Sequence, residues 1–173
     1  MGIRSFSGTL NDQSKSAPIA ATVPVEIASI LESTFQRLLA EATFADAWPR
    51  PELSVRSETI SEVGFHVILP ILSPWKGRIL LAGDEETVRD LAAGFHSIPD
   101  AMVDKAISLD FLAELATLLV RDLFCVSENP VDVQEPVELE PAQARALWEE
   151  AAAARTVLGC NQGRILAALL VGP

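Results

Sequence analysis

Two β-hairpin patterns constrain the fold more than any other feature of this sequence. In the first, a β-rich stretch over 64–72 is followed by a turn over 73–77 and a second apolar strand over 78–83. In the second, strands over 156–160 and 164–171 flank a turn at 161–163. Because hairpins join antiparallel neighbours, the sequence predicts an antiparallel β-sheet.

Four further segments predict helices that would pack on this sheet. Apolar residues recur at three- and four-residue steps over 25–42, and again from about 100–103 to 126. Asp84 is a favourable N-cap for a third helix that ends near Phe95, and an alanine-rich stretch over 142–154 predicts a fourth. Helices packed on an antiparallel sheet define an α+β fold.

The remaining segments carry weaker patterns. Residues 53–61 are mixed and could form a strand. Residues 131–137 are β-prone but lie among Pro130, Pro136 and Pro141, which favours an edge strand or a connection. Residues 1–22 are small and polar and predict a flexible N-terminal tail, which leaves 23–173 as a single domain.

The charge of the chain excludes several classes of partner. There are 24 acidic residues against 13 basic ones, a net charge of −11. Nucleic acids and anionic membrane surfaces are bound by clustered Lys and Arg, and the sequence has no such cluster. No apolar run reaches the roughly 18–20 residues of a membrane span, and no secretory signal follows Arg4. We therefore expect a cytoplasmic protein.

Residue types that commonly carry chemistry are scattered. Cys125 and Cys160 lack metal-ligand spacing and are predicted to be buried free thiols. His66 and His96 lie in different predicted elements and are interpreted as structural or surface residues. There is no glycine-rich phosphate loop and no metal-binding motif, so we expect neither a bound cofactor nor a metal.

One polar stripe stands out on the long predicted helix. Asp110, Glu114, Thr117 and Arg121 follow steps of four, three and four, which places them one above the other on one helix face. The apolar residues Phe111, Leu115, Leu118 and Leu119 would lie opposite. Such a stripe is either a solvated face without chemistry or an interaction surface.

The segment that carries this stripe resembles the long helix of the CheX and CheC chemotaxis phosphatases. In that family an acidic residue is followed three positions later by asparagine, and the matching residues here are Glu114 and Thr117. Segments 75–81 and 84–91 resemble the family's glycine-led strand and the helix after it, and 131–137 resembles its later strand. The resemblance covers about residues 25–173 through the order and spacing of short motifs.

The resemblance implies a partner and a set of roles. Family members bind a response-regulator receiver domain of the CheY type and accelerate the loss of phosphate from its aspartate. Glu114 would be the anchor that engages a lysine of the partner, and residue 117 would orient the attacking water. We expect Asp110 and Arg121 to contribute to partner binding. Any Mg²⁺ would belong to the receiver domain.

The sequence departs from the family pattern at the position that orients water. An asparagine amide both donates and accepts hydrogen bonds, whereas Thr117 is shorter and β-branched. Because an error of about 1 Å in positioning can cost about 100-fold in rate, we expect weak or lost aspartyl-phosphate phosphatase activity. The first predicted helix offers only Glu32-Ser-Thr-Phe at the site of a second motif, with no asparagine to replace the first.

Three functions remain open at this point. The chain could be a phosphatase of receiver domains, a binding module that has lost the chemistry, or a structural and oligomerisation module related to flagellar switch proteins. A homodimer could form through the C-terminal hairpin, where 165–171 is nearly all apolar, if that strand lies at a sheet edge. A buried central strand would have the same composition.

Overall fold

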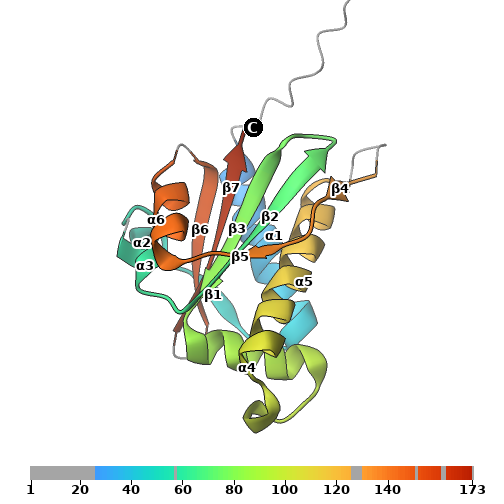
Figure 1. Ribbon diagram of the computed structural model, residues 1–173, viewed down its shortest axis with the longest axis vertical. Coiled ribbons are helices and arrows are strands. Elements are labelled where there is room, and N and C mark those ends of the chain that lie inside the picture. The colour runs from blue at the N-terminus through green and yellow to red at the C-terminus, as the bar shows by residue number, and fades with distance from the viewer. Residues whose placement is uncertain (1–25, 57, 126–129, 151, 161–162, 173) are drawn as a thin grey trace, which may run out of the picture.

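The fold is an antiparallel β-sheet with helices on both faces (Figure 1). A computed structural model describes residues 26–56, 58–125, 130–150, 152–160 and 163–172. The predicted flexible tail over 1–22 lies outside this range. The α+β class predicted from the two hairpins is confirmed.

Over the described residues the sheet has seven strands, in the order β1-β6-β7-β3-β2-β4, and β5 also pairs with β2. All of these pairs are antiparallel. The strands are β1 (Ala47–Pro49), β2 (Phe65–Ser73), β3 (Gly77–Gly83), β4 (Asp132–Val133), β5 (Val137–Glu138), β6 (Ala152–Cys160) and β7 (Gly163–Val171). Both predicted hairpins are therefore present, as β2–β3 and β6–β7.

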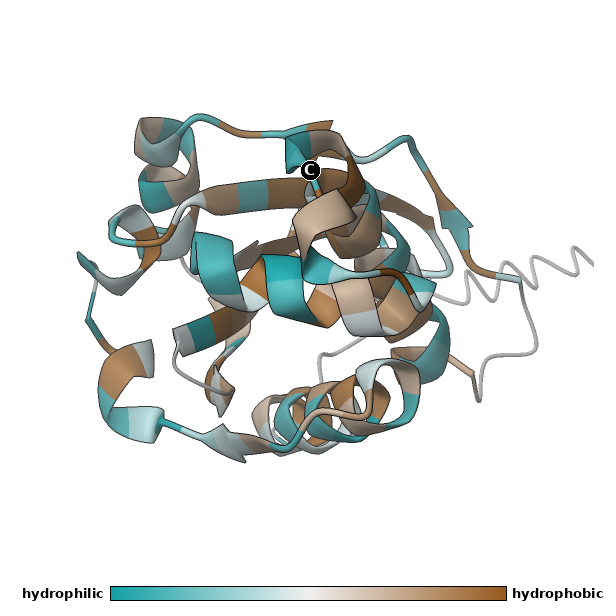
Figure 2. Ribbon diagram, turned by 90° about the horizontal axis from the view of Figure 1, so that it is seen from below, coloured by the Kyte–Doolittle hydropathy of each residue, from teal (hydrophilic) through white to brown (hydrophobic). Residues whose placement is uncertain are grey.

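Helices bury both faces of the central strands. They are α1 (Ile27–Thr43), α2 (Pro51–Ser54), α3 (Glu58–Ser61), α4 (Glu85–His96), α5 (Lys105–Leu123) and α6 (Pro141–Glu149). On one face, α1, α4 and α5 close the larger core over Ile79 and Leu81 of β3. On the other face, α3 and α6 close a smaller core over Leu80 and Ala82. In Figure 2 the strands are mainly hydrophobic, and the helices carry both hydrophobic and hydrophilic residues.

The structure differs from the sequence-based expectation in one open assignment and in the limits of two helices. Residues 53–61, which could have been a strand, contribute to the short helices α2 and α3, where Pro51 occupies the first turn of α2. Residues 152–154 are the start of β6 rather than the end of α6, because they pair with Leu169 and Leu170 of β7. The long helix begins at Lys105, after a separate 3-10 turn over Asp100–Met102, and ends at Leu123.

The position of β7 decides which edges are available for dimerisation. This strand lies between β6 and β3, so the C-terminal apolar strand is central and is not an edge for pairing with a second copy. The β-prone segment over 131–137 forms the opposite edge of the sheet through β4 and the start of β5, as expected from the prolines in and around it. None of the described helices is both long and apolar enough to cross a membrane.

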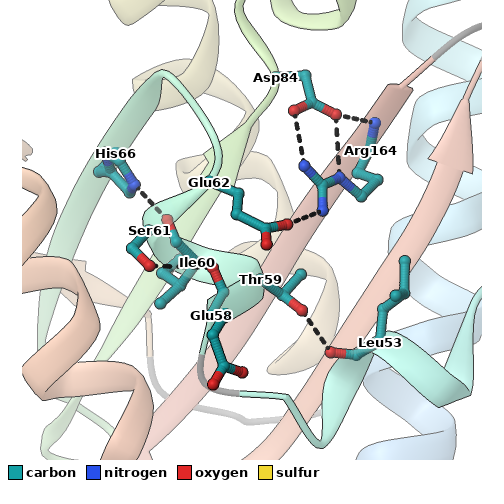
Figure 3. A network of polar contacts seen from close by, with 9 residues as sticks. All are labelled: Leu53, Glu58, Thr59, Ile60, Ser61, Glu62, His66, Asp84 and Arg164. Atoms are coloured by element: carbon teal, nitrogen blue, oxygen red, sulfur yellow. Dashed lines mark hydrogen bonds and ion pairs between the residues drawn. The ribbon is translucent and has the colours of Figure 1, made fainter.

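An ion-pair network connects the start of β7 to the residue that follows α3 and to the junction of β3 with α4 (Figure 3). Asp84 occupies the predicted N-cap position of α4. Its carboxylate accepts hydrogen bonds from Arg164 and makes no capping bond to the helix. The Arg164 main-chain nitrogen donates to Asp84 Oδ2 at 2.6 Å, and Nη2 donates to Oδ1 at 3.1 Å. Nη1 of the same side chain donates to Glu62 Oε2 at 2.9 Å. Three segments distant in sequence therefore share one guanidinium.

We expect Arg164→Ala to destabilise the fold by about 1–3 kcal/mol, because it leaves the half-buried Asp84 carboxylate without its charged donor. Urea denaturation followed by circular dichroism measures this. Arg89→Ala is the matched control, since Arg89 pairs with Glu85 on the exposed surface of α4, where such a pair contributes about 0.5 kcal/mol or less. Equal losses from the two variants would contradict a special role for the Arg164 network.

His66 is a buried histidine of β2 that is held by α3. Its Nε2 donates to the Ile60 carbonyl oxygen at 2.7 Å, and the side chain is 2% exposed. Burial lowers the pKa of His66, and the hydrogen bond to Ile60 opposes this shift only in part. The structural interpretation of this residue is therefore supported.

The lowered pKa of His66 predicts an acid-sensitive fold. Because the unfolded chain binds this proton near pH 6.5 and the folded chain does so only at lower pH, stability is complete above pH 6.5. It then falls with decreasing pH, by at most about 1.4 kcal/mol per unit, until the folded pKa is reached. Urea midpoints at pH 7.5 and pH 5 test this, and His66→Gln should show a smaller difference between them. An unchanged difference would assign the acid sensitivity to other groups.

Candidate functional site

The candidate site lies on α5, whose orientation is fixed by its apolar face. Asp104 caps the helix by accepting a hydrogen bond from the Ile107 main-chain nitrogen at 2.9 Å. Seven residues of α5 are buried, at helical spacing: Ser108, Phe111, Leu112, Leu115, Ala116, Leu119 and Val120. This face is committed to the larger core, so the polar stripe of the same helix must face outward.

The stripe predicted from the sequence is present but is not uniform. Asp110, Glu114 and Arg121 are exposed, and Thr117 is half-buried between them. Glu114, Thr117 and Arg121 line the same surface groove, which has a volume of about 460 Å³. Asp110 is not among the residues that line it. The structure thus brings together three of the four predicted residues.

The groove also has apolar walls that the sequence analysis missed. They are Ala113 and Leu118 of α5, Phe95 near the end of α4, and Pro136 between β4 and β5. Phe95 is held by Phe111, with ring centroids 5.4 Å apart. Leu118 was expected on the buried face, but it is only partly buried because it borders this groove. Periodicity within one helix gives no signal for walls contributed by other segments.

The Thr117 hydroxyl is turned back toward its own helix. Its Oγ1 donates to the Ala113 carbonyl oxygen at 3.0 Å, which is the usual i−4 bond of a helical threonine. The hydroxyl hydrogen is therefore committed to the backbone, and only the oxygen lone pairs remain to accept a hydrogen bond. This arrangement can accept a hydrogen bond from a water but has no donor to offer to an anion.

A second and larger cavity lies at the other end of α4 and has no comparable arrangement. It has a volume of about 1430 Å³ and is lined mainly by charged residues. The three arginines in its wall, Arg50, Arg89 and Arg164, each pair with a carboxylate of this chain. The arginines of this cavity are thus already engaged, whereas Glu86, Asp90 and Asp100 leave it net acidic. We place the candidate site at the α5 groove, where three of the predicted residues lie.

The other residues with potential chemistry are dispersed. Cys160 is buried as expected, and burial raises the pKa of its thiol. The expectation for Cys125 was wrong, since it lies exposed just beyond the end of α5. His96 is partly buried next to Phe95. Within the ranges that the structure describes, no group of three or more His, Cys, Asp or Glu side chains could hold a metal ion.

The fold of the chain is similar to that of solved CheX chemotaxis proteins. The chain superposes on chemotaxis protein CheX from Vibrio vulnificus with a TM-score of 0.58 and 10% identity, over 81% of this chain and 92% of that one. It also superposes on CheX from Desulfovibrio desulfuricans, with a TM-score of 0.56 and 9% identity, over 85% of this chain and 99% of that one.

A third similar structure contains a partner. It is a chain of the CheX–CheY–BeF3–Mg²⁺ complex from Borrelia burgdorferi, with a TM-score of 0.57 and 12% identity, over 82% of this chain and 95% of that one. These likenesses show a CheX/CheC-type fold. No family model and no curated protein matches the sequence.

The groove predicts that residue 117 tolerates the family's asparagine. In Thr117→Asn the new amide would extend into the groove, so we expect a change in unfolding free energy within about 1 kcal/mol. Ala116→Asn is the matched control, because Ala116 is fully buried beside it and should lose more than about 2 kcal/mol. Thermal melts of both variants measure this, and similar losses would place residue 117 in the core.

Proposed function

We propose that the chain binds a response-regulator receiver domain at the α5 groove, with weak or lost aspartyl-phosphate phosphatase activity. The observation that carries the proposal is that Glu114 and Thr117, at the two positions of the family motif, line one open groove. The fold supports it, since one structure of the same fold is a complex of CheX with CheY. Exposure of Glu114 favours an interaction surface over a purely structural role.

Glu114 suits the role of anchor for a basic group. It is exposed at the rim of the groove, one helical step from Thr117, and its carboxylate can accept hydrogen bonds from a lysine ammonium. The apolar walls Phe95 and Pro136 would exclude part of the water from such a pair. Mg²⁺ would be supplied by the receiver domain.

Thr117 is the reason to expect little hydrolysis. Loss of phosphate from an aspartate needs a water held in line with the phosphorus atom, and catalysis depends on how well that water is positioned. The Thr117 oxygen can accept a hydrogen bond from a water, but its donor is engaged by Ala113 and it is held close to the helix axis. An asparagine amide would reach one bond further and could both donate and accept.

The direct test is the decay of phosphate from a chemotaxis-type receiver domain, with and without this protein. We expect little acceleration by the natural chain and about 10- to 100-fold more by Thr117→Asn, because the amide reaches the attacking water. Adding Glu114→Ala to that variant should abolish the gain, while adding Glu86→Ala, an exposed position on α4 away from the groove, should keep it.

Two results would change the proposal. If the natural chain accelerates decay and Glu114→Ala abolishes this, the threonine hydroxyl is a working substitute and the chain is an active phosphatase. If neither the natural chain nor Thr117→Asn accelerates decay or binds any receiver domain of its source organism, the likeness stops at the fold. The structural and oligomerisation role would then take its place.

A further inference from the structure

Arg121 lies one helical turn after Thr117 and lines the same groove. Side chains of an α-helix lean toward its N-terminus, so a residue covers the surface over the preceding turn. This general lean directs an arginine at position 121 toward the part of the groove that Thr117 borders, and Arg121 is among the residues that line the groove. A group that approaches Thr117 from solvent would meet this cation.

No described carboxylate close in sequence competes for Arg121. Asp122 is bound to Arg37 of α1, with Nη2 and Oδ2 2.8 Å apart. The positions three and four residues away on α5 and just beyond it carry no acid, since they are Thr117, Leu118, Phe124 and Cys125. Among the described residues, no carboxylate oxygen lies within 4.0 Å of the Arg121 nitrogens. The surrounding walls, Phe95 and Pro136, are apolar.

The charge of the groove therefore changes sign along the helix, from Glu114 to Arg121. Glu114 and Arg121 are seven residues apart, a separation of about 10 Å along the axis. Thr117 lies between them with its hydroxyl hydrogen bound to Ala113, so it adds no donor for an anion. Arg121 is the one cationic side chain among the residues that line this groove. A ligand that is complementary to the groove carries a positive group near Glu114 and an anion near Arg121.

We propose that Arg121 recognises the phosphoryl group of the receiver domain, so that this groove distinguishes the phosphorylated partner from the unphosphorylated one. This inference rests on the proposed function, because it assigns the phosphoryl group to the same groove. A guanidinium presents N–H donors in a fixed fork that matches phosphate oxygens, and charge-assisted bonds of this kind are about twice as strong as neutral ones. Binding of this kind leaves the acyl phosphate intact.

The test compares binding of one receiver domain in two states. The probe is a chemotaxis-type receiver domain of the source organism, either untreated with Mg²⁺ or loaded with beryllofluoride and Mg²⁺ as the phosphoryl mimic. Titration calorimetry at about 0.1 M salt gives both dissociation constants. We expect the natural chain to prefer the loaded form by about tenfold or more, and Arg121→Gln to remove most of that preference. Its affinity for the untreated form should change by less than about threefold.

Two further variants distinguish a specific contact of Arg121 with the phosphoryl mimic from a general effect of the protein's charge. Arg145→Gln makes the same charge change on α6, across the sheet from the groove, and should keep the natural preference. Arg121→Lys keeps the charge but not the fork, and should retain part of the preference. Thermal melts verify that each variant is folded, and a folded Arg121→Gln is expected because the residue is exposed.

Each remaining outcome rejects a distinct claim. If the natural chain binds both forms equally, or if Arg121→Gln keeps the full preference, the role of Arg121 is wrong while receiver binding stands. If Arg145→Gln loses the preference as well, long-range charge accounts for it and the specific contact is rejected. If no receiver domain binds in either form, the proposed function fails, and this inference fails with it.

Discussion

The structure depends on two strands, β3 and β7, that are buried on both faces. They pair in one register from Gly77 opposite Val171 to Gly83 opposite Ile165. Because successive side chains point to opposite faces, this pair needs a helical layer on each side. One layer contains α5, which is held by its buried face and cannot rotate without exposing it. The outward position of Glu114 is thus a consequence of how the central strands are covered.

The groove depends on a second constraint at the edge of the sheet. The chain pairs with β2 at β4, through Val133, and again at β5, through Glu138. Pro136 interrupts the ladder between these points and forms a wall of the groove. An ion pair between Lys105 and Glu138, 2.6 Å apart, links this edge to the start of α5. The site is therefore assembled from segments that are distant in sequence and meet only in the folded structure.

These dependencies explain what could be predicted from the sequence. The hairpins and the α5 stripe were predictable because alternation and helical periodicity are local patterns. Residues 152–154 were assigned to a helix because alanine favours helices, and pairing with β7 outweighed that weak preference. For 53–61, Pro51 at a first helical turn was the available signal for α2. Phe95 and Pro136 gave no signal, since only tertiary packing brings them to α5.

The chemistry of the groove depends on which hydrogen-bond donors of α5 are not already bound within the helix. A threonine within a helix satisfies its hydroxyl locally, and the bond from Thr117 to Ala113 removes the hydrogen that a phosphoryl oxygen could accept. An arginine cannot be satisfied in this way at its own helix, because its guanidinium reaches beyond the backbone and the acid beside it is bound to Arg37. A hydroxyl in place of an amide at position 117 thus weakens the positioning of a water. It has less effect on the attraction of an anion by Arg121. If a phosphoryl group occupies this groove as proposed, the composition of the groove favours holding that group over hydrolysing it.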